Sequence, residues 1–286
     1  MSRIRRGWGL TKKSCALMNQ HRVLIRFPLY GAVATALLAI AFLGPGLYLL
    51  GKNSLGGAIP LIVIGVYILS VVGFYFSVGL AAAADMTFRG QQASVADGLA
   101  VARSRFSQIC GWAAIATTVS VVIGTLERQG VFGEIVARLF GVAWALVAFL
   151  AVPVIAIEGT GPLGTMKRSA SMFRERWGQQ ITGNIAIRAV VFLVGVFPAI
   201  LVIVAGLTLI SFSLVVGAVV MATGILLLAL AILVSRVLSG VFGVALYRYA
   251  TNGQAVGGFT SGELESAVRA RGGRRATPPG ATPGTV

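Results

Sequence analysis

The sequence has few residues of the kinds that build most catalytic and metal sites. It contains one histidine, His21, two cysteines, Cys15 and Cys110, and only eight acidic residues against twenty-four lysines and arginines. A single histidine excludes a histidine-rich metal site, and the two cysteines lack the CxxC spacing that binds zinc. His21 lies next to Arg22 in a basic segment, where we expect an interfacial role and not catalysis. The sequence therefore predicts no metal, no cofactor and no enzymatic activity.

Charge is also missing from long stretches of the chain. Residues 189–235 carry no charged side chain over forty-seven positions, and residues 27–84 carry only Lys52. A single helix of forty-seven residues would be about 70 Å long, whereas the hydrocarbon core of a bilayer is about 30 Å thick, so the run must fold back as two spans. Charged residues make up 11% of the chain, against about 25% in soluble domains. These absences exclude a soluble domain and indicate a polytopic membrane protein.

The apolar runs lack the alternation of barrel strands, so helices are the only remaining way to pair the backbone in lipid. We predict an all-α bundle of six transmembrane helices with additional interfacial amphipathic helices. Pro28 is expected to begin the first span, and Gly44-Pro45-Gly46 to kink or fray its outer end. The predicted spans are 27–50, 58–84, 109–126, 139–157, 185–209 and 214–235, the last continuing as an amphipathic helix to 249.

Three regions follow from this pattern. Residues 1–26 form a basic N-terminal segment, expected to lie as an amphipathic helix at the membrane interface. Residues 27–250 form the transmembrane domain. Residues 251–286 are rich in glycine, proline, alanine and threonine and hold too little apolar area to offset the entropy of ordering, so we predict a disordered tail.

The positive charges predict the topology. Under the six-span model, twenty-one lysines and arginines fall on one side, and only Lys52, Arg128 and Arg138 fall on the other. Cytoplasmic segments of membrane proteins carry an excess of Lys and Arg, so both termini are predicted to be cytoplasmic and the protein to reside in the cell membrane. The net charge of +16 is then a consequence of topology, and we expect no nucleic-acid partner.

Two stretches resemble each other and suggest an internal duplication. In each, a span ends at an acid, Asp85 or Glu158, and a polar loop with a basic amphipathic helix follows. The acids match at an offset of 73 residues and the apolar stripes at 67, so a gap of six is needed. Chance similarity between amphipathic helices is the alternative. The stripes are Val95, Leu99, Ala102 and Phe106 in the first stretch, and Pro162, Met166, Ser169 and Phe173 in the second.

Acids at the ends of spans are candidates for structural ion pairs. We expect Glu158 to pair with Arg188 or Arg236, which the predicted spans place at a similar depth, and Asp85 to lie in a similar setting. Such pairs would hold the cytoplasmic ends of the helices together. The alternative is that each group is solvated independently, with the arginines extending toward the interface.

The basic amphipathic segments predict contacts with lipid. Each Lys or Arg near an anionic membrane surface contributes about 1 kcal/mol of binding. We therefore expect the partners to be the bilayer itself, anionic phospholipids, and membrane proteins or further copies of this chain. The candidate headgroup contacts are Arg5, Arg6, Lys12, Lys13, Lys167, Arg168, Arg174 and Arg176.

Three classes of function stay open. The favoured one is a non-enzymatic membrane protein that organises lipid or partner proteins at the cytoplasmic leaflet. A small-solute permease or channel is the alternative, since Pro153 and Pro198 interrupt spans, but no charged residue lies at the middle of any span, where transporters usually bind substrate. A lipid-modifying enzyme would have to use Asp85 and Glu158 as its carboxylate pair.

Several motifs carry a resemblance to a known family. They begin with Arg6-Gly7-Trp8 and Phe27-Pro28-Leu29, continue with Val152-Pro153-Val154 through Glu158-Gly159, Pro162, Lys167-Arg168-Ser169 and Trp177-Gly178, and end with Ala245-Leu246-Tyr247. This set is similar to an uncharacterised family of bacterial six-helix integral membrane proteins. The likeness covers about residues 5–260. It implies a helical membrane fold and no established activity. The chain also resembles the membrane domain beside some glycerophosphodiester phosphodiesterases, without their soluble catalytic domain.

Overall fold

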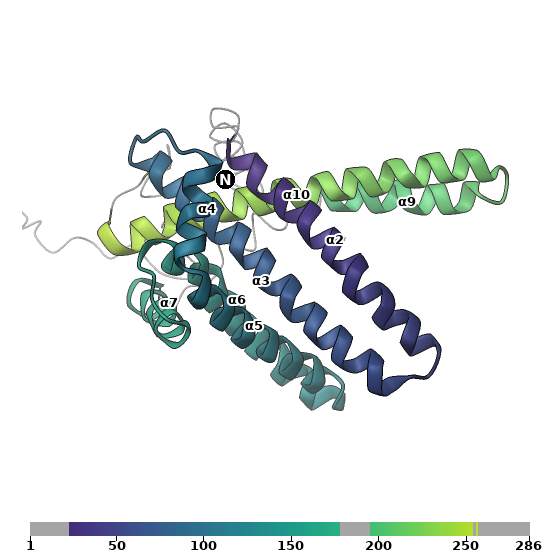
Figure 1. The fold of residues 1–286 in the computed structure, drawn as a ribbon, viewed down its shortest axis with the longest axis horizontal. Helices are drawn as coiled ribbons and strands as arrows, with labels where there is room; N and C mark the ends of the chain where they lie inside the picture. Colours follow the sequence, from purple (N-terminus) through teal and green to yellow (C-terminus); the bar gives the residue numbers. More distant parts are fainter. Residues whose placement is uncertain (1–22, 178–194, 254–255, 257–286) are drawn as a thin grey trace, which may run out of the picture.

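The computed structural model describes residues 23–177, 195–253 and 256, and in this part of the chain every regular element is a helix (Figure 1). Residues 1–22 of the predicted N-terminal segment and nearly all of the predicted tail lie outside the described residues, and the last four residues of that segment begin the first described helix. The helices are α2 (Val23–Gly51), α3 (Leu55–Phe88), α4 (Val95–Ser104), α5 (Phe106–Glu127), α6 (Gly130–Ile157), α7 (Pro162–Trp177), α9 (Phe197–Leu209) and α10 (Leu214–Asn252).

Five of these helices are long and apolar enough to cross a bilayer, namely α2, α3, α5, α6 and α10. The chain is therefore a helical, multi-pass membrane protein. The sequence predicts six spans, and the difference lies at the predicted fifth span, 185–209. Its described part is α9, which has 13 residues and would reach only about 20 Å. The beginning of that predicted span, 185–194, lies outside the described residues.

The ends of α2 differ from the prediction. The helix begins at Val23, so Pro28 lies inside it and not at its first position. It also continues through Gly44-Pro45-Gly46 to Gly51, so its outer end does not fray there, and the predicted kink stays a prediction. In lipid a broken helix would leave backbone groups without partners, and packing against a neighbouring helix, here α3, lets a span tolerate an internal proline.

The five long helices and α9 form three hairpins that meet at one end of the molecule (Figure 1). The hairpins α2–α3 and α5–α6 extend from this end in similar directions, whereas α9–α10 points away from both (Figure 1). We call the region where they meet the packed end, because most of the buried residues of the described chain lie there. It comprises Leu24–Gly31 of α2, Val78–Asp85 of α3, Ile109–Ala113 of α5, Leu150–Ala156 of α6 and Val237–Ala250 of α10, together with α4 and α7.

Close backbone contacts join α3 and α4 within the packed end. A Cβ atom built on Gly98 would lie 2.6 Å from the carbonyl oxygen of Gly79 and 2.5 Å from Cζ of Phe27. Phe27 is fully buried and packs against both glycines. Only glycine allows α4 to approach α3 this closely while the Phe27 ring from α2 fills the adjoining space.

The apolar stripes of the two amphipathic helices are confirmed in part, because Ala102 and Ser169 are buried and Val95, Leu99 and Met166 pack partly buried against the core. The buried residues are Gly98 and Ala102 in α4, and Thr165, Ser169 and Met172 in α7. Phe106 is exposed and begins α5, so its place in the stripe was wrong. Small side chains form the buried face because the helices approach their neighbours closely. The buried residues Gly98 and Ala102 of α4 precede the buried residues Thr165 and Ser169 of α7 by 67 positions, which is the offset of the predicted stripes. The duplication itself stays a prediction.

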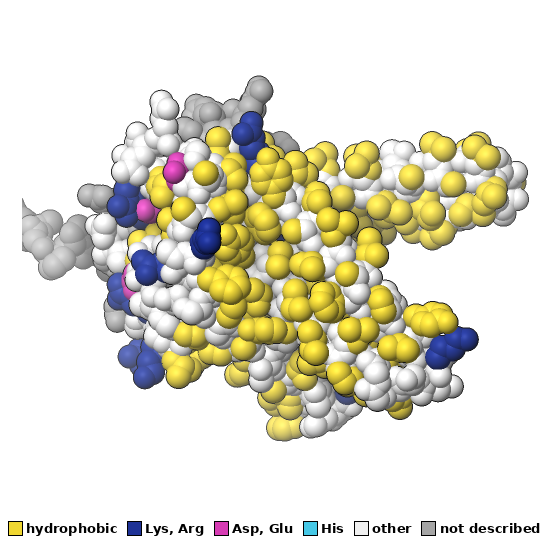
Figure 2. All heavy atoms as spheres, in the orientation of Figure 1, with side chains coloured by type: hydrophobic (Ala, Val, Ile, Leu, Met, Phe, Trp, Pro, Cys, Tyr) yellow, Lys and Arg dark blue, Asp and Glu magenta, His cyan; other side chains and the backbone are white. Residues whose placement is uncertain are grey.

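Charged side chains gather at the packed end. In Figure 2 the basic and acidic groups cluster there, and the hairpins that leave it are largely apolar. Five basic side chains at this end are exposed: Arg26, Arg89, Arg103, Lys167 and Arg174. Ser94 begins α4 with a capping box, in which hydrogen bonds from its hydroxyl and its backbone N–H hold the pKa of Asp97 below the usual value of 3.8.

Candidate functional site

The two acids that the sequence singles out both lie at the packed end, on different helices. Asp85 lies near the end of α3 and is 6% exposed. Glu158 follows the last residue of α6. That helix ends here because Gly159 adopts a left-handed conformation, with φ of 66°, and its N–H donates back to the carbonyl oxygens of Val154 and Ile155. The local backbone thus orients Glu158 toward α7 and α10.

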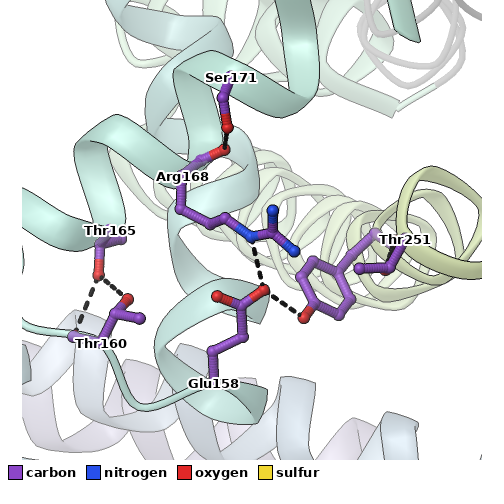
Figure 3. A network of polar contacts seen from close by, with 7 residues as sticks. Glu158, Thr160, Thr165, Arg168, Ser171 and Thr251 are labelled. Carbon is purple, nitrogen blue, oxygen red and sulfur yellow. Dashed lines mark hydrogen bonds and ion pairs between the residues drawn. The ribbon is translucent and has the colours of Figure 1, made fainter. Parts of the chain in front are cut away.

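Glu158 binds one side chain from each of these two helices through the same oxygen atom. Oε1 accepts a hydrogen bond from Nε of Arg168 at 2.9 Å and from the hydroxyl of Tyr247 at 2.7 Å. Figure 3 shows the Arg168 side chain extending from α7 toward Glu158. The turn before α7 is held by Thr160 and Thr165, whose hydroxyl groups lie 2.8 Å apart. Glu158 therefore connects α6 to α7 and to α10.

Asp85 is bound by two arginines, one on each carboxylate oxygen. Oδ1 accepts from Nε of Arg248 at 2.7 Å, and Oδ2 lies 2.9 Å from Nη2 of Arg89, one turn further along α3. The side chains of Asp85 and Arg248 are only 9% and 15% exposed, whereas Arg89 is 53% exposed. The pair between Asp85 and Arg248 is thus a largely buried ion pair between α3 and α10.

A single turn of α10 binds both acids. Tyr247 and Arg248 are consecutive residues, and they contact Glu158 and Asp85, which lie 73 positions apart in the sequence. The two acids occupy equivalent places in the predicted duplication, so α10 joins its two halves at matching points. Sequence reasoning missed both residues as partners. The available signal was the helical pattern that continues from 236 to 249 with an arginine near its end.

The predicted partners of Glu158 need correction. Arg236 is wrong, because α10 is one continuous helix and places Arg236 eleven residues before Tyr247. At about 1.5 Å per residue it lies roughly 16 Å away along the helix axis, beyond the reach of an arginine side chain. Arg188, the other predicted partner, lies outside the described residues.

The predicted headgroup contacts have different outcomes. Arg168 binds Glu158 through its Nε and is 40% exposed, and its contact with lipid stays a prediction. Lys167 and Arg174 are exposed on α7. Arg176 belongs to α7, but its side chain lies outside the described part of the structure. The predicted contacts at the N-terminus also lie outside it: Arg5, Arg6, Lys12 and Lys13.

The arrangement favours a structural role for the acids. Each carboxylate accepts a hydrogen bond from an arginine on another helix, Glu158 from Arg168 and Asp85 from Arg248. Taking charges out of water costs several kcal/mol, so a pair of this kind contributes more to a unique arrangement of helices than to net stability. Within the described ranges, no group of three or more His, Cys, Asp or Glu residues is placed to hold a metal ion.

We expect Glu158→Gln to lower stability by about 1–3 kcal/mol, because the hydrogen bonds from Arg168 and Tyr247 lose the negative charge of their acceptor and the ion pair with Arg168 is removed. Arg168 is 40% exposed, so water offsets part of this loss. The check is thermal unfolding of the purified protein in detergent. Tyr247→Phe should cause a smaller loss, since it removes one hydrogen bond and leaves the ion pair. Unchanged thermal stability in both variants would contradict the structural role of Glu158.

Comparison with known proteins gives one match. Residues 58–258 match the model of a family of unknown function, DUF6159. No curated protein and no solved structure matches the chain. The match confirms the resemblance to an uncharacterised family, whereas the likeness to the membrane domain beside glycerophosphodiester phosphodiesterases stays a prediction.

Proposed function

The chain belongs to the DUF6159 family, whose function is unknown, and from its own residues we propose that it binds anionic phospholipid headgroups at the cytoplasmic leaflet. In this proposal the protein is not an enzyme. It organises lipid, or partner proteins through lipid, at the packed end of the bundle.

One observation carries the proposal: at the packed end the buried acids are paired with arginines, whereas several basic side chains are exposed. The two buried or half-buried acids are already bound by arginine, whereas Arg26, Arg103, Lys167 and Arg174 are exposed. Exposed cations gathered at one end of a membrane protein are attracted to anionic lipid of the adjacent leaflet. The amphipathic helices α4 and α7, which carry three of these residues, are the elements placed to meet that surface.

The same contacts argue against chemistry by the acids. A lipid-modifying enzyme would need a carboxylate held ready to exchange a proton with substrate. Both oxygen atoms of Asp85 are bound by arginine, and Glu158 is held by Arg168 and Tyr247.

The proposal includes the six-span topology with both termini in the cytoplasm. It is supported by the distribution of basic residues, since Lys52, Arg128 and Arg138 are the described bases at the opposite ends of the hairpins. It places the packed end at the cytoplasmic face of the cell membrane.

The test compares stabilisation of the purified full-length protein by phosphatidylglycerol and by phosphatidylcholine. The midpoint of thermal unfolding in detergent should rise more with phosphatidylglycerol. In the double variant Lys167→Gln/Arg174→Gln, about 10- to 30-fold more phosphatidylglycerol should be needed for the same rise, because each base contributes about 1 kcal/mol. The control Lys52→Gln/Arg128→Gln removes two bases from the opposite end and should behave as wild type. Equal stabilisation of the wild-type protein by both lipids would overturn the proposal.

A further inference from the structure

The burial pattern of three helices marks where the protein leaves the hydrocarbon core. Each of these helices begins at the end opposite the packed end and becomes mostly buried further along. The mostly buried stretch begins at Val78 in α3, at Leu150 in α6 and at Val237 in α10. These positions lie 23, 20 and 23 residues after the first residues of their helices, Leu55, Gly130 and Leu214. At about 1.5 Å per residue they correspond to roughly 30–35 Å, which is the thickness of the hydrocarbon core. From these positions toward the packed end, the helices contact other parts of the protein in place of lipid.

Arg236 lies at this boundary on α10. It is exposed and immediately precedes the buried stretch that begins at Val237. One turn further along, Gly240 packs against Leu80 of α3, so Arg236 lies about one turn from Leu80 toward the far ends of the hairpins. The uncharged residues 189–235 come directly before it. Arg236 is thus the first charge that α10 presents at the inner edge of the bilayer.

The described carboxylates near the packed end are occupied by other partners. Asp85 is bound by Arg248 and Arg89, Glu158 by Arg168, and Asp97 accepts hydrogen bonds from Ser94. Within the part of the chain that the structure describes, no ion pair to Arg236 is present. A charged side chain in the hydrocarbon core costs about 2.5–3.5 kcal/mol, so an exposed arginine at its edge is stabilised by a phosphate at headgroup level. The planar guanidinium can bind two phosphate oxygens at once.

We propose that Arg236 binds the phosphate of an anionic phospholipid where α10 leaves the packed end. This inference rests on the proposed function and makes it specific. The other exposed bases attract the leaflet as a whole, whereas Arg236 holds one lipid at a defined depth beside the α9–α10 hairpin. The lipid phosphate there supplies a counterion, which the described part of the chain does not.

The test is native mass spectrometry of the full-length protein released from mixed phosphatidylglycerol and phosphatidylcholine. The wild-type protein should retain phosphatidylglycerol, and Arg236→Gln should weaken retention of one molecule by about tenfold or more, with Arg236→Lys intermediate because an ammonium group binds phosphate as a point charge. Arg138→Gln, an exposed arginine at the opposite end, is the matched control and should retain the lipid. Inorganic phosphate should not displace it, and displacement by phosphate alone would overturn the lipid assignment.

The outcomes separate the two proposals. If the wild-type protein shows no preference for phosphatidylglycerol, the proposed function fails. If it does and Arg236→Gln retains as much lipid as wild type, only the inference fails.

The depth of Arg236 can also be measured without altering it. In a Cys15→Ser/Cys110→Ala background, a spin label at Ser235→Cys should report headgroup depth, and one at Leu226→Cys should lie about 14 Å deeper along α10. Equal depths for the two labels would overturn the placement.

Discussion

Replacement of Asp85 by asparagine is expected to destabilise the protein by about 3–5 kcal/mol. The change keeps the shape of the side chain but removes the charge that balances Arg248, whose side chain is only 15% exposed. Leaving one partner of a buried ion pair unbalanced is far more costly than removing the pair as a whole. The measurement is thermal or denaturant unfolding in detergent, and we expect α10 to lose hydrogen-exchange protection near Arg248 first.

The chain offers its own control for this experiment. Glu134 and Arg138 form an ion pair one turn apart on α6, and both side chains are exposed. Glu134→Gln should therefore cost less than about 1 kcal/mol. In the double variant Asp85→Asn/Arg248→Gln, part of the lost stability should return, because no buried charge is left without a partner. Equal losses for Asp85→Asn and Glu134→Gln would contradict the buried pair.

The second large effect is expected for Gly98→Leu, which should prevent α4 from docking on α3. Even the Cβ of alanine would lie 2.6 Å from the Gly79 carbonyl oxygen and 2.5 Å from the Phe27 ring. A backbone carbonyl cannot rotate away as a side chain can, so Gly98→Ala alone should cost about 1–3 kcal/mol, and leucine more. Faster hydrogen exchange throughout α4, together with a lower unfolding midpoint, would report the loss.

Gly73→Ala is the matched control for Gly98. Gly73 also lies within a helix, and no described atom outside its own helix lies within 4 Å of the place where its Cβ would be. Because glycine weakens a helix interior by about 0.5–1 kcal/mol relative to alanine, this change should be neutral or slightly stabilising. If Gly98→Ala behaved in the same way, the close approach of α3 and α4 would be refuted.

The helical membrane fold could be predicted because it depends on properties of each segment. Uncharged runs longer than the bilayer is thick require spanning helices, whatever their neighbours are. The continuation of the last span as a helix to 249 was also predicted, and α10 runs unbroken to Asn252. Prediction failed at which part of this helix meets the acids. Residues 237–250 pack against protein, so Tyr247 contacts Glu158 and Arg236 does not.

In the candidate site, the sequence did not predict which side chains pair with each other. Asp85 and Glu158 were identified as acids at span ends, but neither Arg248 nor Tyr247 was recognised. These contacts join residues 163 and 89 positions apart. Which side chains meet depends on the rotation and axial shift of one helix relative to another, and hydrophobicity along each helix carries little information about either.

Membrane residence, the helical class and the gathering of positive charge at one end of the bundle are properties of the linear chain, because the bilayer acts on every segment separately through hydration and charge. The partners of the two acids and the burial of Gly98 were decided only by the tertiary structure. They depend on how closely small residues such as Gly79 and Gly98 let helices approach, and that distance is set jointly by all the helices in contact.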